Sequence, residues 1–304
     1  MTNPSIASRV SGRNRARATS LAARVAWVMV VGVFLCFFAL PIAWMLLAPT
    51  RSDAGIVHGA PLTFGSLDDL VAGWQHLYDF QSHAIVTWVS NSALYSFSAL
   101  AITLVTAVPA GYALATARFR GRVVLLTATL MVMLMPNATL VLPLYLEMDA
   151  LGLAGSRLSV ILPLSFFPFG VYLTYIYYAT TVSGDLLDAA RMDGASEWMV
   201  FRRIALPLAR PVVALVAFFS FVHSWNNFFL PFVMLPDSEQ YPAQVGLNTL
   251  LTASPMFNSS SGISEILRPE LALAAVLTSI PVLIVFLFSQ RALVSGMTAG
   301  ATKG

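Results

Sequence analysis

Lysine and cysteine are almost absent from this sequence of 304 residues. The only lysine, Lys303, stands one residue from the end, whereas a P-loop needs a lysine to hold the phosphates of ATP. The chain therefore cannot contain a Walker A site, and any ATP has to be hydrolysed by a partner. The only cysteine, Cys36, lies inside an apolar run, which excludes a disulfide framework and a cysteine metal site.

Charge is scarce as well. Charged residues make up 10% of the chain and hydrophobic residues 58%, with a mean hydropathy of +0.77. Ordinary soluble domains carry about 25% charged residues, so this composition predicts an integral membrane protein. The net charge of +3 does not indicate nucleic-acid binding, because in a membrane protein the placement of the charges carries the information.

Long apolar runs divide the chain into six predicted membrane spans, because about 20 apolar residues cross a bilayer. None of the six contains Asp, Glu, Lys or Arg, which disfavours an ion-coupled transporter. The predicted fold class is an all-α membrane protein with one domain over residues 25–289, an N-terminal tail over 1–24 and a C-terminal tail over 290–304. The spans are expected at about 25–47, 84–117, 123–146, 158–180, 212–235 and 271–289, the third interrupted by Pro136 and Pro143.

The basic residues predict the orientation. Five arginines lie before the first span, three between the second and third, four between the fourth and fifth, and Arg291 and Lys303 after the sixth. These are 14 of the 17 basic residues, all on one side of a six-span protein. Lys and Arg favour the cytoplasmic side, so both termini and the loop over 181–211 are expected there.

The segment between the fourth and fifth spans is the most charged part of the second half of the chain. Ser183 and Ser196 are each placed to cap a helix. Leu186, Ala190 and Gly194 recur every four residues, which predicts an apolar, small-sided helix face able to lie close against another backbone.

This segment also resembles the "EAA" loop of ABC importer permeases, with Asp188 at the position where that family usually has Glu. In that family the loop is a cytoplasmic coupling helix that docks into a groove on the ATP-hydrolysing subunit. The resemblance implies an ATPase-coupling role for Asp188, Ala189, Ala190, Asp193, Gly194, Ala195, Ile204, Leu206 and Pro207.

Further stretches are similar to carbohydrate permeases of this family, in particular the maltose "G" permease type. Residues 91–92, 110–115 and 119–121 resemble the start of the permease core, and residues 290–304 resemble the tail. Residues 225–228 resemble the family's "WNEF" segment, with Asn227 where an acid is common. The resemblance covers about residues 84–304 and implies the type I importer fold.

The fifth span carries the most polar part of any span, around Trp225, Asn226 and Asn227. Amides and aromatic faces suit a sugar or polyol path, and the same groups equally suit contacts between helices. His223 is the one titratable residue in a span, and is either a pathway residue or a histidine hydrogen-bonded to a neighbouring helix.

The resemblance implies an assembly in the bacterial plasma membrane. Its partners are a sister permease, two copies of a cytoplasmic ATP-binding subunit, an extracytoplasmic solute-binding protein and membrane lipid, with no nucleic acid. No cofactor, metal or catalytic residue is expected in this chain, because ATP and magnesium belong to the partner ATPase. The alternatives are half of a secondary transporter, and a membrane enzyme using His58, His76 and His83.

Overall fold

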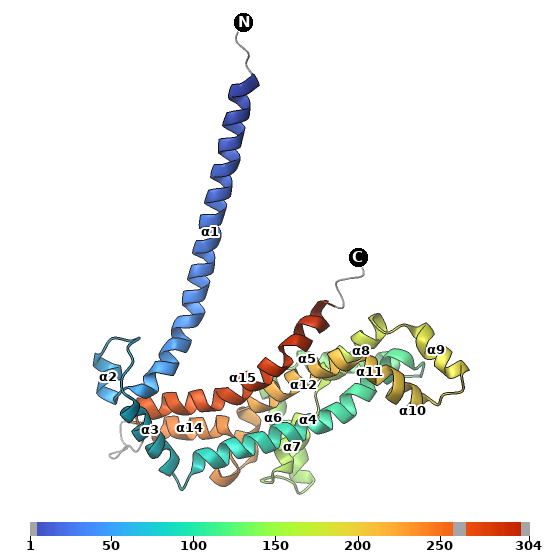
Figure 1. The fold of residues 1–304 in the computed structure, drawn as a ribbon. Coiled ribbons are helices and arrows are strands. Elements are labelled where there is room, and N and C mark those ends of the chain that lie inside the picture. Colours follow the sequence, from blue (N-terminus) through green and yellow to red (C-terminus); the bar gives the residue numbers. More distant parts are fainter. Residues whose placement is uncertain (1–4, 258–265, 299–304) are drawn as a thin grey trace.

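The computed structural model describes residues 5–257 and 266–298, and within these stretches the chain is helical (Figure 1). The elements are α1 (Ser5–Leu47), η1 (Ala48–Thr50), α2 (Asp53–His58), α3 (Leu67–Asp79), α4 (Ala84–Thr116), α5 (Arg122–Leu134), α6 (Asn137–Ala150), α7 (Leu158–Ser165), α8 (Pro168–Thr180), α9 (Gly184–Met192), α10 (Glu197–Val200), η2 (Phe201–Ala205), α11 (Leu206–Leu208), α12 (Arg210–Trp225), α13 (Phe229–Met234), η3 (Ser238–Gln240), α14 (Ala243–Ala253) and α15 (Arg268–Thr298).

Four helical stretches are long and apolar enough to cross a membrane: Ala23–Thr50, Ala84–Thr116, Leu158–Thr180 and Arg268–Gln290. They match the predicted first, second, fourth and sixth spans. Two bent helix pairs would raise the number to as many as six. The second pair joins Glu197–Leu208 to Arg210–Trp225 at 77°, so the fifth predicted span begins with α12.

The third predicted span is sharply bent. Its two halves, α5 and α6, meet at an angle of 111°, with Met135 and Pro136 between them. Proline cannot donate a backbone hydrogen bond and disfavours a helical conformation in the residue before it. Pro136 therefore ends the helix, whereas Pro143 lies inside α6 and leaves it continuous.

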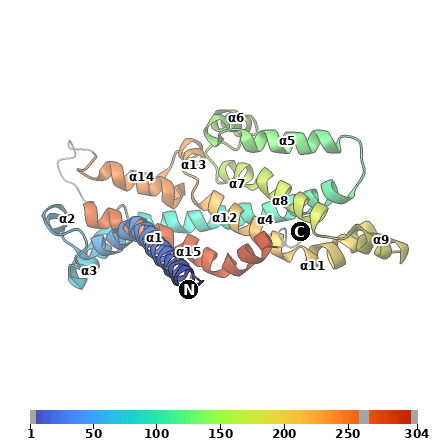
Figure 2. The same ribbon diagram turned by 90° about the horizontal axis from the view of Figure 1, so that it is seen from above.

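At the centre of the bundle, α4 packs along α8 and α12 (Figure 2). The contact between α4 and α8 is close, because a Cβ added at Gly111 would lie 2.5 Å from the Cβ of Thr174. The core cluster beside this contact contains Val108 and Tyr112 from α4, Tyr178 from α8 and residues of the loop that follows.

Short helices that the sequence analysis did not predict lie in the two expected outer loops. Residues 51–83 contain α2 and α3, and residues 236–270 contain η3 and α14. The hydroxyls of Ser52 and Ser66 cap α2 and α3 by accepting from the backbone N–H groups of Gly55 and Asp69. Asp53 also pairs with Arg268 at 2.7 Å, which fastens α2 to the start of α15.

Both predicted tails continue adjoining helices. Helix α1 begins at Ser5 rather than near residue 25, and α15 runs to Thr298 rather than ending at 289. Alanine and arginine are good helix formers and neither described extension contains a proline, so both helices continue beyond the apolar residues of the predicted spans. Residues 1–4 and 299–304 lie outside the described part.

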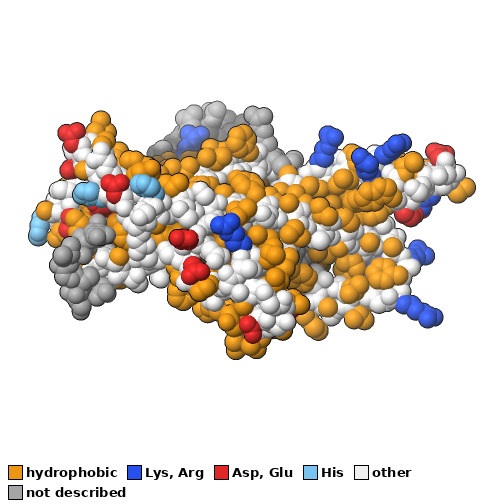
Figure 3. Space-filling view, turned by 90° about the horizontal axis from the view of Figure 1, so that it is seen from below, with side chains coloured by type: hydrophobic (Ala, Val, Ile, Leu, Met, Phe, Trp, Pro, Cys, Tyr) orange, Lys and Arg blue, Asp and Glu red, His pale blue; other side chains and the backbone are white. Residues whose placement is uncertain are grey.

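Basic side chains are unevenly distributed along the molecule (Figure 3). Most of the arginine side chains seen on this face lie toward the end that carries α9 and α10, with another near the middle beside acidic side chains, and the histidines lie at the opposite end, with α2 and α3. A broad apolar surface lies between the two ends, as expected for a chain surrounded by lipid.

Candidate functional site

The loop between α8 and α12 contains a short helix with a well-defined end. Helix α9 follows Ser183, which stands at the N-cap position without a side-chain cap bond, and the helix stops at Met192. Gly194 then takes a left-handed conformation with φ of 84°. The N–H of Ala195 donates to the carbonyl of Ala190 at 3.1 Å, and that of Gly194 donates to the carbonyl of Arg191 at 3.0 Å. This is a Schellman ending, in which a left-handed glycine closes the last turn.

The second half of the loop returns the chain to the bundle. The Ser196 hydroxyl accepts from the N–H of Met199 at 3.4 Å and so caps α10, as the sequence predicted. The following turn, η2, is a π-helix, and Pro207 comes directly after its exit at Leu206. A proline removes one α-helical hydrogen bond, so the π turn lies where the regular ladder is already interrupted.

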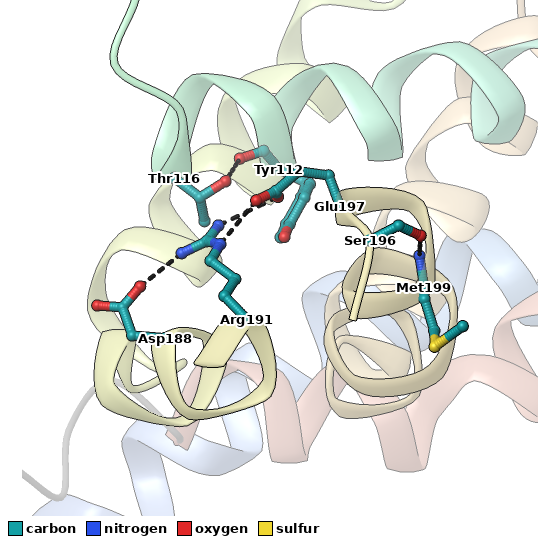
Figure 4. A network of polar contacts seen from close by, with 7 residues as sticks. All are labelled: Tyr112, Thr116, Asp188, Arg191, Ser196, Glu197 and Met199. Atoms are coloured by element: carbon teal, nitrogen blue, oxygen red, sulfur yellow. Dashed lines mark hydrogen bonds and ion pairs between the residues drawn. The ribbon is translucent and has the colours of Figure 1, made fainter. Parts of the chain in front are cut away.

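Arg191 joins the two halves of the loop (Figure 4). Its Nη1 donates to Asp188 Oδ1 at 2.6 Å, and its Nε and Nη2 donate to the two carboxylate oxygens of Glu197 at 2.7 and 3.2 Å. The hydrogen bonds to Glu197, and then to Asp188, raise the pKa of Arg191. The same contact with Arg191 lowers the pKa of Glu197. The side chain of Asp188 therefore has a partner within the loop, a contact that the sequence analysis did not predict.

The predicted coupling residues fall into two groups. Ala190, Ala195, Ile204 and Leu206 are half-buried and pack against the core cluster that contains Val108, Tyr112 and Tyr178. The remaining five are exposed: Asp188, Ala189, Asp193, Gly194 and Pro207. The motif thus combines residues that seat the loop on the bundle with residues that form its outer surface.

The expectation for Gly194 was wrong in one respect. It does not continue the face of Leu186 and Ala190, because it lies beyond the end of α9. A Cβ at Gly194 would meet nothing within 4 Å, so close packing does not explain the glycine within the chain. The positive φ of Gly194 explains why a glycine stands there, because residues with a side chain disfavour the left-handed conformation.

Large apolar side chains lie on the outer surface of the loop, and the sequence analysis predicted Leu186 on an apolar face but missed Met192 and Trp198. Met192 is 88% exposed, Trp198 65% and Leu186 47%. Their position among charged residues in a loop was the signal that could have indicated a contact surface. The Trp198 ring lies 5.6 Å from Phe201, and Phe201 lies 5.1 Å from Tyr112 of α4, so the surface is joined to the bundle by packed aromatic rings.

The polar patch of the fifth span lies where that span breaks. Helix α12 ends at Trp225, and Phe229 begins α13. Trp225 is buried and donates to the carbonyl of Thr278 in α15 at 2.9 Å, so it makes a contact between helices. Asn227 Oδ1 accepts from the N–H of Leu230 in the first turn of α13 at 3.2 Å, whereas Asn226 is exposed.

His223 packs its ring 5.5 Å from that of Phe167. Its Nδ1 is buried and has no hydrogen-bond partner among the described residues, so this atom does not make the bond to a neighbouring helix that was one of the two alternatives for His223. Of the four predicted pathway residues, Asn226 is therefore the one with an exposed side chain, and the structure gives Trp225 and Asn227 local structural contacts.

Residues 107–299 match the family described as "Binding-protein-dependent transport system inner membrane component". This match covers more than half of the chain and includes the whole loop from α9 to α11. The chain belongs to this permease family.

Relatives of the permease match most of its length. It is 32% identical over 288 residues to the arabinooligosaccharides transport system permease protein AraQ of Halalkalibacterium halodurans, covering 92% of this chain and 97% of the relative. It is 27% identical to the trehalose transport system permease protein SugB of Mycobacterium tuberculosis, and the match covers 91% of this chain and 97% of the relative. It is 31% identical to the maltose/maltodextrin transport system permease protein MalG of Photorhabdus laumondii, and the match covers 72% of this chain and 73% of the relative.

A solved structure shares the fold. A chain of a bacterial ABC transporter involved in the import of the acidic polysaccharide alginate superposes with a TM-score of 0.75 at 24% identity, covering 96% of this permease and 99% of that chain. The permease therefore has the helical architecture of an ABC importer subunit.

Proposed function

We propose that this permease is the membrane subunit of an ATP-driven importer for a neutral carbohydrate, with its α9–α10 loop docked on a partner ATPase. The family match supports the importer role. The three relatives above carry names of oligosaccharide or disaccharide transport systems. The predicted spans contain no charged side chain, which favours a neutral solute over an ionic one.

The observation that carries the proposal is the shape and surface of the α9–α10 loop. It projects at one end of the bundle (Figure 1) and presents Leu186, Met192 and Trp198 to its surroundings. Exposed apolar groups of this size mark contact surfaces. The hydrogen bonds of Arg191 hold α9 and α10 together, so the two helices can move as one rigid unit.

The same loop is built to pass movement into the membrane domain. Trp198 contacts Phe201, Phe201 contacts Tyr112, and the rings of Tyr112 and Tyr178 lie 5.2 Å apart. Tyr112 and Tyr178 belong to α4 and α8, the two most closely packed long helices. A displacement of the loop by the ATPase would therefore reach both helices through packed rings rather than through a mobile linker.

The rest of the assembly is proposed from the resemblance to ABC importer permeases and, for ATP binding, from the scarcity of lysine in this chain. Lys303 is its only lysine, so ATP and magnesium would be bound by two copies of a separate ATP-binding subunit. A sister permease would supply the other half of the translocation path, and an extracytoplasmic binding protein would deliver the solute. Both termini and the α9–α10 loop would then lie in the cytoplasm of a bacterial cell.

Cysteine cross-linking tests the docking. In a Cys36→Ala background, Met192→Cys places a thiol at the most exposed apolar position of the loop, and Met131→Cys places one on α5, where Met131 is 63% exposed. With a reagent that couples a thiol at one end to an amine at the other, applied to membranes, Met192→Cys should cross-link to lysines of the ATPase and Met131→Cys should not. Absence of a Met192→Cys product, or equal products from both, would contradict docking at this loop.

A second measurement separates an importer from an ion-driven transporter. The purified assembly should hydrolyse ATP faster when its loaded binding protein is added. Uptake driven by an ion gradient without ATP would overturn the proposed function.

A further inference from the structure

The turn between α4 and α5 carries three arginines in five residues: Arg118, Arg120 and Arg122. They line a hollow of about 520 Å³ together with Phe119, Gly121, Val123 and Val124. This turn is on the predicted cytoplasmic side but is separate from the α9–α10 loop. None of the three arginines forms an ion pair with an acid in the described part of the chain.

Arg122 is held in place but incompletely satisfied. Its guanidinium carbon lies 6.0 Å from the centre of the Tyr175 ring of α8, close enough for a cation–π contact. Its Nε is buried and has no hydrogen-bond partner among the described residues. Buried donors are nearly always paired, so an unpaired one calls for a partner outside the chain.

The start of α5 adds to the positive potential of the hollow. Gly121 occupies the N-cap position with φ of 91° and offers no side chain to cap the helix, and the first turn contains no acid. Uncapped N–H groups at the start of a helix attract anions. A Cβ at Gly121 would meet nothing within 4 Å, so the space in front of it is open.

The wall of the hollow that continues into α5 is apolar and exposed. Val123 is 74% exposed, Val124 69% and Leu125 52%. A soluble phosphate would contact the arginines and leave this surface bare. An amphiphile with a phosphate and an acyl chain would cover both.

We propose that the Arg118–Arg122 turn binds the phosphate headgroup of an anionic phospholipid of the inner leaflet, with an acyl chain along the exposed face of α5. Guanidinium groups bind phosphate through paired hydrogen bonds. The bound headgroup lies at the turn that joins α4 to α5, where Arg122 also contacts Tyr175 of α8.

The test uses the full chain assembled with its partner subunits in neutral detergent. Phosphatidylglycerol with a fluorescent acyl chain is titrated, and the dissociation constant is measured. Each basic residue near an anionic lipid surface contributes roughly five-fold to affinity, so R118Q/R120Q/R122Q should weaken binding by on the order of 100-fold. The single variant R120Q, at an exposed side chain, should weaken it about five-fold.

A matched control lies in the same chain. Arg13, Arg15 and Arg17 have the same spacing in the N-terminal segment, so R13Q/R15Q/R17Q removes the same charge from the same predicted side. Its lipid affinity should stay within about three-fold of the unmodified chain. Equal losses in the two triple variants would show general charge attraction and overturn the site.

Two further results would also overturn it. Competition by inorganic phosphate as effective as that by the lipid would make this a site for a soluble anion. Loss of the ATPase subunits from R118Q/R120Q/R122Q with lipid affinity unchanged would make the turn a protein contact. Neither result bears on docking at the α9–α10 loop, which is tested separately by the Met192→Cys cross-link.

Discussion

At the scale of single residues, Arg191 shows what a sequence pattern leaves out. The motif predicts that Asp188 takes part in docking on the ATPase. An acid in that role would be expected to pair with a basic residue of another subunit. In the structure Asp188 and Glu197 both bind Arg191, one from within α9 and one from α10. The spacing of acids and arginines predicted a charged loop, but the pairing depends on how the turn at Gly194 brings α10 back beside α9.

We expect Arg191→Gln to uncouple the loop rather than unfold the protein. Exposed ion pairs contribute about 0.2–1 kcal/mol each, and Asp188 and Glu197 are largely exposed, so stability should fall by roughly 1 kcal/mol or less. Binding-protein-stimulated ATPase activity should fall several-fold. Arg202→Gln is the control, because it removes the same charge from an exposed side chain nearby. An equal loss of ATPase activity in both variants would show that the net charge of the loop matters and that the contacts of Arg191 with Asp188 and Glu197 do not.

The contact between Arg191 and Glu197 also has a defined pH dependence. Arg191 lowers the pKa of Glu197, so Glu197 stabilises the folded loop above its unfolded pKa of about 4.3, and this contribution is lost as pH falls through the lower, folded pKa. The effect of Arg191→Gln on ATPase activity should therefore be constant between about pH 6 and pH 8.

The two asparagines of the fifth span should behave differently when replaced. Asn227→Leu removes the hydrogen bond to the N–H of Leu230 in the first turn of α13, a change that typically costs about 1 kcal/mol, so the thermal unfolding temperature should fall. Asn226 is exposed, so Asn226→Leu should leave that temperature within about a degree and lower solute uptake. Unchanged uptake in Asn226→Leu at normal expression would place the pathway elsewhere.

At the scale of elements, long apolar helices were predictable and the shape of their breaks was not. Hydropathy located α4, the stretch Leu158–Thr180 that contains α7 and α8, and α15, because each has to match the thickness of the bilayer. The outer helices α2 and α3 were missed although Ser52 and Ser66 carry capping signals, since short amphipathic helices look like polar loops. The 111° angle at Pro136 depends on what each half packs against, which one sequence does not encode locally.

The close approach of α4 and α8 gives a prediction at this scale. Gly111→Ala places a methyl group 2.5 Å from Thr174 and 2.8 Å from the Tyr175 nitrogen, and overpacking of this kind costs about 1–3 kcal/mol. Gly73→Ala in α3 meets nothing within 4 Å and should be neutral or stabilise by up to about 1 kcal/mol. Thermal unfolding of the detergent-solubilised protein compares them; equal stability of the two variants would contradict the packing.

At the scale of the whole molecule, the arginine distribution predicts that both termini and the α9–α10 loop lie on the cytoplasmic side. A reporter active only in the cytoplasm should work when fused after Gly304 and fail when inserted near Ser260, a position outside the described residues. The reverse pattern would put α9 and α10 on the outer side and remove any contact with a cytoplasmic ATPase.

The central claim is that the turn at Gly194 holds the coupling surface in one shape. Valine strongly disfavours the left-handed conformation observed there, with φ of 84°, and asparagine tolerates it. Space is open around the position, so neither side chain should clash within the chain. The decisive measurement is solute uptake and binding-protein-stimulated ATPase activity on one preparation of Gly194→Val and of Gly194→Asn. We predict a loss of about ten-fold or more in both activities for Gly194→Val, as expected for a cost of about 1–2 kcal/mol at this turn, and near-normal values for Gly194→Asn. Normal activities in Gly194→Val would show that the loop is only a connector between spans.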